Sequence, residues 1–171
     1  MLTPNQENFL EKIPAGRSAK IEPFDPKVLE VAGEIIEQIK KTMPETEVFF
    51  GGASALKIAG QNDIDLNILS TPAEYPRHLP KLIELFGEPA TQSSNLIKWE
   101  FTKDEFDVEA YLTDKNSPAL KEQMKTFKIL RDFAELRQEY EKLKLACDGL
   151  PFKEYMRRKY EFFNKILAEK T

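Results

Sequence analysis

The sequence predicts an α+β fold in which a mixed sheet is flanked by helices and followed by two C-terminal helices. Three observations lead to this prediction. Apolar residues recur at helical spacing over residues 28–39, and they alternate with polar residues over residues 63–69, as in a strand with one buried face. Residues 95–112 alternate in the same way on both sides of a short polar turn, which is typical of a hairpin.

The chain begins with an arm over residues 1–26, which contains four prolines and little periodicity. We expect one short helix in it, near residues 5–12. The first long helix should begin at Asp25 and Pro26, because aspartate caps a helix and proline suits its first position. It should end near Lys41, because a lysine in the last turn interacts favourably with the negative end of the helix dipole.

Shorter elements follow, bounded by glycine, proline or polar turns: a strand over 45–50, a helix over 53–58, a strand over 63–69, a helix over 79–86, and hairpin strands over 95–101 and 106–112. Beyond the hairpin the pattern is helical. Ser117 and Pro118 begin a long helix that we expect to continue through Leu143. After a break at residues 148–151, a final helix should cover residues 152–169.

Length and composition are those of one folded domain. The chain has 171 residues, of which 41% are hydrophobic. We predict an N-terminal arm (1–26) and a single domain (27–171), with the sheet core in 27–113 and the helical part in 117–169. The net charge of −4 provides no overall attraction to nucleic acid or to an anionic membrane. Cys147 is the single cysteine, so we expect a cytoplasmic protein without an intramolecular disulfide.

A glycine turn precedes the strand over residues 63–69. Gly51 and Gly52 allow the backbone to approach a ligand closely, and Ser54 follows where a short helix begins. Free N–H groups at a helix start bind phosphate. The sequence therefore predicts a phosphate-binding turn at Gly51, Gly52 and Ser54.

Two aspartates share the polar face of the strand that follows the turn. Asp63 and Asp65 stand roughly 6.6 Å apart on one face of an extended chain. Such a pair can hold one or two divalent ions, and we expect Mg²⁺ or Mn²⁺. The strand over 106–112 also has an acidic face. If the two strands are neighbours, a third carboxylate joins the pair, with Glu109 as the first choice and Asp107 as the second.

The residues Gly51-Gly52-Ala53-Ser54 and Asp63-Ile64-Asp65-Leu66 resemble the signature of the DNA polymerase beta-type nucleotidyltransferase superfamily. Within it, the chain is most similar to the GrpB family, through residues 52–66, 127–132, and 136–144 with 155–167. The family usually has serine at the position of Gly52, and many members lack the acid present here as Asp63. Many carry histidines where this chain has Glu109 and Tyr111. These departures move the sequence toward a metal-binding nucleotidyltransferase pattern.

The resemblance implies that an NTP is bound and that its nucleotidyl group passes to an unknown small-molecule or protein acceptor, with release of pyrophosphate. Asp63, Asp65 and Glu109 would be the catalytic and metal-binding residues. A basic residue of the C-terminal helices would meet the remaining phosphate charge, and the candidates are Lys128, Arg131 and Lys159.

Other functions are compatible with the same residues. The variable acids of the relatives favour a non-catalytic nucleotide- or metal-binding or regulatory protein that keeps the nucleotidyltransferase fold as the alternative. An antitoxin-like partner domain is a third reading, for which the residues offer nothing direct. Nucleic-acid polymerisation is disfavoured, because the net charge is negative and no broad basic groove is evident.

Overall fold

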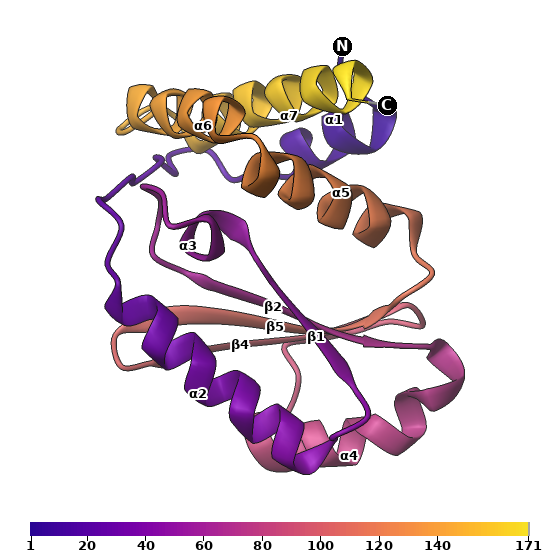
Figure 1. The fold of residues 1–171 in the computed structure, drawn as a ribbon. Helices are drawn as coiled ribbons and strands as arrows, with labels where there is room; N and C mark the ends of the chain where they lie inside the picture. Colours follow the sequence, from indigo (N-terminus) through magenta and orange to yellow (C-terminus); the bar gives the residue numbers. More distant parts are fainter. Residues whose placement is uncertain (171) are drawn as a thin grey trace.

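The computed structural model describes residues 1–170 and contains a five-stranded mixed sheet with helices on both faces (Figure 1). The strands lie in the order β1-β2-β5-β4-β3. They are β1 (Glu47–Gly51), β2 (Ile64–Ser70), β3 (Thr91–Gln92), β4 (Leu96–Lys103) and β5 (Phe106–Asp114). The central strands β2 and β5 are parallel, whereas the other pairs are antiparallel. The predicted α+β class with a mixed sheet is confirmed.

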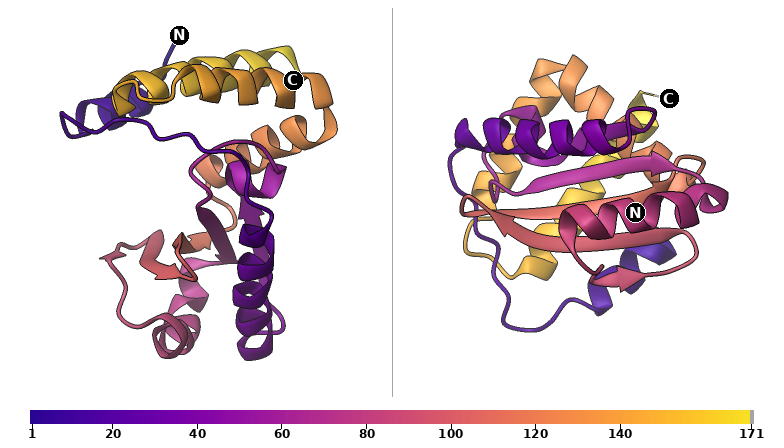
Figure 2. Two further views of the ribbon diagram at one scale, coloured as in Figure 1. Left: turned by 90° about the vertical axis from the view of Figure 1, so that its left-hand side faces the viewer. Right: turned by 90° about the horizontal axis from the view of Figure 1, so that it is seen from below.

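The helices divide between the two faces of the sheet. They are α1 (Pro4–Glu11), α2 (Lys27–Thr42), α3 (Gly52–Leu56), α4 (Tyr75–Phe86), α5 (Pro118–Asp132), α6 (Ala134–Ala146) and α7 (Phe152–Glu169), with a 3-10 turn at Pro72–Glu74. Helices α2 and α4 cover one face, and the right-hand view of Figure 2 shows them lying over it. Helices α1, α5, α6 and α7 form a layer beyond the other face (Figure 1). None of the helices within residues 1–170 is long and apolar enough to cross a membrane.

The main core lies between the sheet and the layer of α2 and α4. Ile64, Leu66 and Ile68 of β2 are fully buried there, as their alternation predicts. Because the odd-numbered residues of β2 point the other way, Asp65 faces the layer of α5, α6 and α7. The polar face of the sheet is therefore covered by helices without being packed as an apolar core, and the candidate site lies on this face.

The long helix expected to continue through Leu143 is two helices, so three C-terminal helices are present where two were predicted. Helix α5 ends at Asp132, Phe133 is extended with φ −112° and ψ 97°, and α6 begins at Ala134. Arg137 donates to the carbonyls of Leu130 and Arg131 at 3.3 and 2.8 Å, which satisfies groups that the end of α5 leaves open. No glycine or proline marks this break, so the apolar pattern alone could not reveal it.

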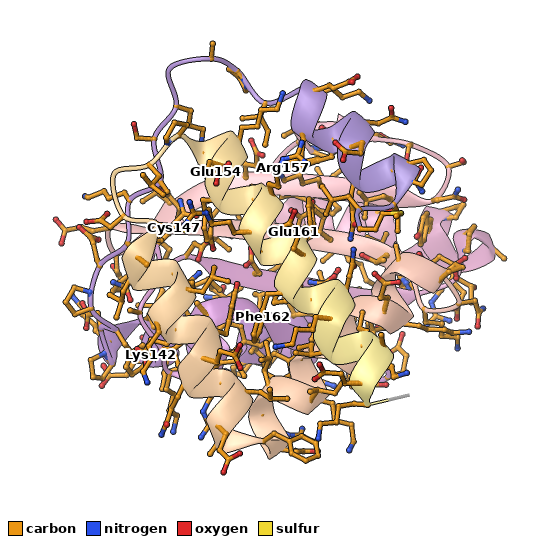
Figure 3. All side chains as sticks on the ribbon, turned by 90° about the horizontal axis from the view of Figure 1, so that it is seen from above. Lys142, Cys147, Glu154, Arg157, Glu161 and Phe162 are labelled. Atoms are coloured by element: carbon orange, nitrogen blue, oxygen red, sulfur yellow. The ribbon has the colours of Figure 1, made fainter. Side chains whose placement is uncertain are left out.

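The N-terminal arm connects the sheet to the helical layer. Ser18 is bridged to Pro151, and Glu22 exchanges backbone hydrogen bonds of 2.7 and 3.0 Å with Gly60. Helix α1 packs on α7, where Glu7 accepts two hydrogen bonds of 3.2 Å from Arg157. Figure 3 looks onto this layer, in which α6 and α7 lie side by side. The arm therefore holds the turn before Asp63 against the C-terminal helices.

Candidate functional site

The glycine turn lies directly against one of the predicted acids. Gly51 ends β1 and pairs with Asp65 in the β1–β2 register. Gly52 has φ +79°, which favours glycine, and a Cβ atom there would stand 2.7 Å from Asp65 Oδ2. The missing side chain therefore gives the Asp65 carboxylate its place beside the turn.

Ser54 connects the turn to the other acid through the backbone. Its side chain is buried, and its hydroxyl donates to the carbonyl of Asp63 at 2.6 Å. The single hydroxyl proton is thus directed to Asp63, whereas the sequence led us to expect a hydrogen bond to phosphate. In this structure Ser54 positions the chain just before β2.

Asp63 and Asp65 form an electrostatically strained pair. Burial, the neighbouring Asp63 and Glu109 raise the pKa of Asp65 from 3.8 to about 7. Burial also raises the pKa of Asp63, although its own backbone N–H and the charges of Lys144 and Lys159 oppose this rise. Within residues 1–170, no hydrogen bond or ion pair to a protein donor holds the Asp65 carboxylate. The pair is thus short of positive charge.

Glu109 lies beside Asp65 in the parallel register of β2 and β5, and its charge raises the pKa of both aspartates. Its oxygens are engaged elsewhere: Lys98 donates to Oε1 at 2.9 Å, and the Tyr111 hydroxyl donates to Oε2. Burial alone would raise the pKa of Glu109, but these two donors outweigh it and lower the pKa. The carboxylate is therefore held as an anion by Lys98 and Tyr111.

Asp107, the second choice for a third carboxylate, lies two residues before Glu109 on β5. It is exposed on β5 and accepts a hydrogen bond of 3.3 Å from Thr102. Of the two alternatives, Glu109 is the one whose charge acts on Asp63 and Asp65.

The acid pair has the donor atoms that a hard divalent cation prefers. In the part of the chain that the structure describes, no three acidic, histidine or cysteine side chains form a ready metal cluster. Mg²⁺, however, is commonly held by one or two carboxylates, with waters and substrate phosphates completing its shell. Asp63 and Asp65 fit that role, because both are half-buried acids whose raised pKa values show that the site disfavours their ionised forms. Glu109 does not complete the set while Lys98 and Tyr111 hold it.

Two lysines of the helical layer act on the acid pair. Lys144 and Lys159 both lower the pKa values of Asp63 and Asp65. Lys159 was expected from the sequence. The other two candidates, Lys128 and Arg131, each form an ion pair with Asp132, at 2.8 and 2.9 Å.

Lys144 was not among the sequence candidates, although a signal for it exists. It stands four residues after Tyr140 and three before Cys147, and all three are buried. A lysine in an apolar helical stripe is unusual, because lysines rarely leave water without a purpose. Arg17 of the arm was missed as well, and its charge reaches Glu109 while its guanidinium lies 3.7 Å from the Phe152 ring centroid.

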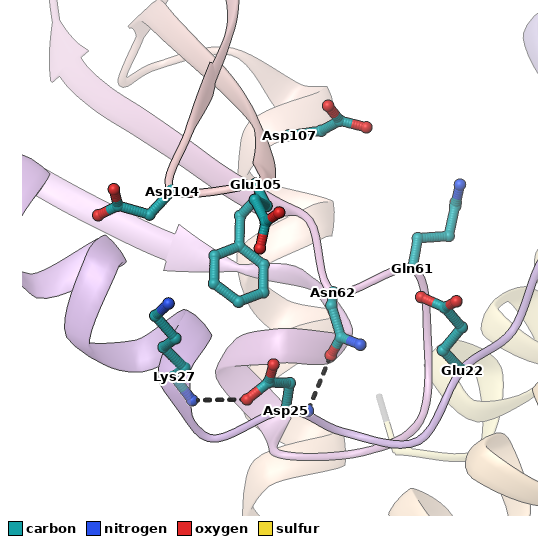
Figure 4. A pocket seen from close by; sticks show the side chains of 9 residues that line it. Glu22, Asp25, Lys27, Gln61, Asn62, Asp104, Glu105 and Asp107 are labelled. Atoms are coloured by element: carbon teal, nitrogen blue, oxygen red, sulfur yellow. Dashed lines mark hydrogen bonds between the residues drawn. The ribbon is translucent and has the colours of Figure 1, made fainter.

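A pocket of about 270 Å³ opens where β2 and β5 begin (Figure 4). Its lining is mainly acidic and consists of Glu22, Asp25, Lys27, Gln61, Asn62, Asp104, Glu105, Phe106 and Asp107. Asn62 shapes it, with its side chain accepting from the Asp25 backbone N–H at 3.0 Å and donating to the carbonyl of Pro23 at 3.0 Å. Asn62 directly precedes Asp63, so the pocket adjoins the acid pair along the chain.

The mixed sheet, the glycine turn and the acids that follow it form the arrangement that the sequence pattern predicted. The sequence profile of the GrpB protein family matches residues 18–169, which is most of the chain. The chain therefore belongs to the GrpB family. No curated protein matches the sequence.

Several solved structures are similar to this one. Cid1, described as having RNA terminal uridylyl transferase activity, has a TM-score of 0.45 and 14% identity, covering 81% of this chain and 46% of that chain. Cid1 described as a poly(U) polymerase with MgGTP bound has a TM-score of 0.46 and 18% identity, covering 77% and 43%. A cytoplasmic RNA terminal U-transferase has a TM-score of 0.41 and 17% identity, covering 81% and 44%. This chain spans less than half of each of these proteins.

Proposed function

We propose that this protein transfers a nucleotidyl group from an NTP to a small-molecule or protein acceptor with the help of Mg²⁺ or Mn²⁺. One observation carries the proposal: the Asp65 carboxylate lies against Gly52, so that the glycine turn and the acid pair meet at one place. A turn that exposes backbone beside two carboxylates can receive phosphate and cation together.

Different residues of the site would bind the phosphates and the cation. The backbone of Gly51 and Gly52 would contact the phosphates, and Asp63 and Asp65 would hold the cation. When bound, the cation would neutralise charge that develops on the transferred phosphate. Lys159 would offset the remaining negative charge of the polyphosphate. Most of the catalytic effect would come from positioning, as in phosphoryl transfer generally.

Glu109 is the proposed base for the acceptor hydroxyl. Lys98 and Tyr111 keep the Glu109 carboxylate ionised, and an ionised carboxylate can accept a proton. It would act after turning from these donors toward Asp65, its neighbour in the β2–β5 register.

Ligand-induced thermal stabilisation tests the binding half of the proposal. We expect the melting temperature of the wild type to rise with NTP plus Mg²⁺ or Mn²⁺, because a ligand that binds only the folded state stabilises it. The Asp63→Asn and Asp65→Asn variants should lose this response. Glu84→Gln, which changes an exposed acid of α4 on the other face of the sheet, should keep it. No rise in the wild type with any NTP and metal would refute the site.

The engagement of Glu109 by Lys98 and Tyr111 specifically favours a second function, a non-catalytic protein that binds nucleotide or metal. Transfer of label from α-³²P-NTP to the protein itself, to small molecules or to RNA ends in an extract separates the two. Label that appears on an acceptor only when Asp63 and Asp65 are intact supports the transferase. Binding without transfer to any acceptor supports the alternative.

A further inference from the structure

Helix α5 is fixed against the chain on both sides of the glycine turn. On β1, before the turn, the ring of Phe49 meets the ring of Phe127 edge-on, with 5.3 Å between the centroids. After the turn, α3 shares a buried apolar cluster with Ile129 and Leu130 of α5. Side chains packed in this way allow little relative movement, so α5 has a defined position beside the turn.

Gln123 of α5 reaches the turn from one helical turn before Phe127. A Cβ atom at Gly51 would stand 3.8 Å from Gln123 Nε2 and 3.1 Å from the nearest ring atom of Phe49. Gly51 and Asp65 are direct partners in the β1–β2 pair, and directly opposed residues of two paired strands point to the same face of the sheet. The Gln123 carboxamide and the Asp65 carboxylate therefore border the same space at the glycine turn.

The carboxamide of Gln123 is available to a ligand. Gln123 is exposed, and within residues 1–170 no hydrogen bond joins its side chain to another residue. Two cations further along α5, Lys128 and Arg131, pair instead with Asp132. Helix α5 therefore presents a neutral donor to the turn, and this donor can bond to a phosphate oxygen without repelling a cation held by Asp65.

We propose that Gln123 donates a hydrogen bond to a phosphate oxygen of the polyphosphate chain that occupies the turn at Gly51 and Gly52. The inference rests on the proposed function, because it adds a residue to the same phosphate site. The turn supplies backbone N–H groups, and the carboxamide adds two N–H donors that rotation of the side chain can direct to the ligand. Because the contact is to phosphate, Gln123 should contribute equally to the binding of every NTP and of inorganic tripolyphosphate.

Isothermal titration calorimetry of the full chain tests this contact, with each NTP and tripolyphosphate as ligands in the presence of Mg²⁺. Gln123→Met keeps the length of the side chain and removes its donors, so we expect both kinds of ligand to bind about 10-fold more weakly. Gln123→Glu also brings a negative charge and should weaken binding further. Gln92→Met and Gln92→Glu are the matched controls, because Gln92 is exposed on β3, at the opposite edge of the sheet from β1. Both should bind as the wild type does.

The outcomes distinguish this inference from the proposed function. All four variants should fold, because both glutamines are exposed and surface substitutions change stability little; thermal melting checks this. Wild-type affinity in Gln123→Met and Gln123→Glu overturns the contact. Weaker binding of NTPs with unchanged binding of tripolyphosphate also overturns it, since Gln123 would then contact the sugar or the base. If the wild type binds neither kind of ligand, the proposed function fails as well.

Discussion

Replacing Asp65 with asparagine should stabilise the protein in the absence of metal. The pKa of Asp65 rises from 3.8 to about 7, chiefly through burial and then through Asp63. One pKa unit corresponds to about 1.4 kcal/mol, so ionised Asp65 costs the folded state about 4 kcal/mol. Burying an unpaired amide costs about 1–3 kcal/mol. Asp65→Asn should therefore raise the free energy of unfolding by about 1–3 kcal/mol at pH 8, and the melting temperature by about 2–12 °C.

The effect of Asp65→Asn has a defined pH dependence. Between pH 4 and 7 the folded state retains a proton on Asp65 that the unfolded chain has released, so the wild type loses stability as the pH rises through this window. The advantage of the variant should be small at pH 4, grow toward pH 7 and stay constant above it.

Urea unfolding in EDTA across this pH range measures the advantage, with Asp107→Asn as the control because Asp107 is exposed. The control should differ from the wild type by less than about 0.5 kcal/mol. A variant no more stable than the wild type at pH 8 would refute the assigned burial of the Asp65 charge.

Three further predictions follow from single contacts. Gly52→Ala should destabilise the protein by about 2 kcal/mol or more, because φ is +79° and the new Cβ meets Asp65 Oδ2 at 2.7 Å. Gly33→Ala is the control, because a Cβ atom there enters open space within α2, and it should stabilise the protein by about 0.5–1 kcal/mol. If urea unfolding shows the same change in stability for both variants, the close approach of Gly52 to Asp65 is contradicted. Burial lowers the pKa of His78, so the stability lead of the wild type over His78→Asn should shrink as the pH falls below about 6.5; a constant lead would argue against a buried neutral imidazole. Tyr111→Phe removes a donor to Glu109, which should raise the pKa of that carboxyl in ¹³C NMR titration, and an unchanged pKa would exclude the hydrogen bond.

Much of the sheet and its helices follows from local sequence patterns. The alternation of Ile64, Leu66 and Ile68 with polar residues specifies a strand with one buried face, and the structure places all three in the core. Asp25 and Pro26 were expected to begin a helix; α2 begins one residue later, at Lys27 after Pro26, and the Asp25 carboxylate accepts from the Lys27 backbone N–H at 2.9 Å. These signals lie within a few residues of one another, so they can be recognised without knowing which distant segments pack together.

Other features depend on contacts between distant segments. The break at Phe133 depends on Arg137 reaching back to carbonyls of α5, and no local residue type announces it. The hydroxyl of Ser54 is directed to Asp63, a contact that a phosphate-binding pattern does not reveal. Each of these depends on how the chain returns upon itself in three dimensions.

By itself, the sequence determined the glycine turn, the two aspartates on one strand face and the likeness to nucleotidyltransferases. Only the tertiary structure decided which charges surround them. The parallel pairing of β2 and β5 places Glu109 beside Asp65, while Lys98 and Tyr111 hold it. Packing of α6 beneath Gly60 encloses Lys144. The physical reason is that charge interactions depend on distance and burial, and both arise when segments far apart in the chain pack together.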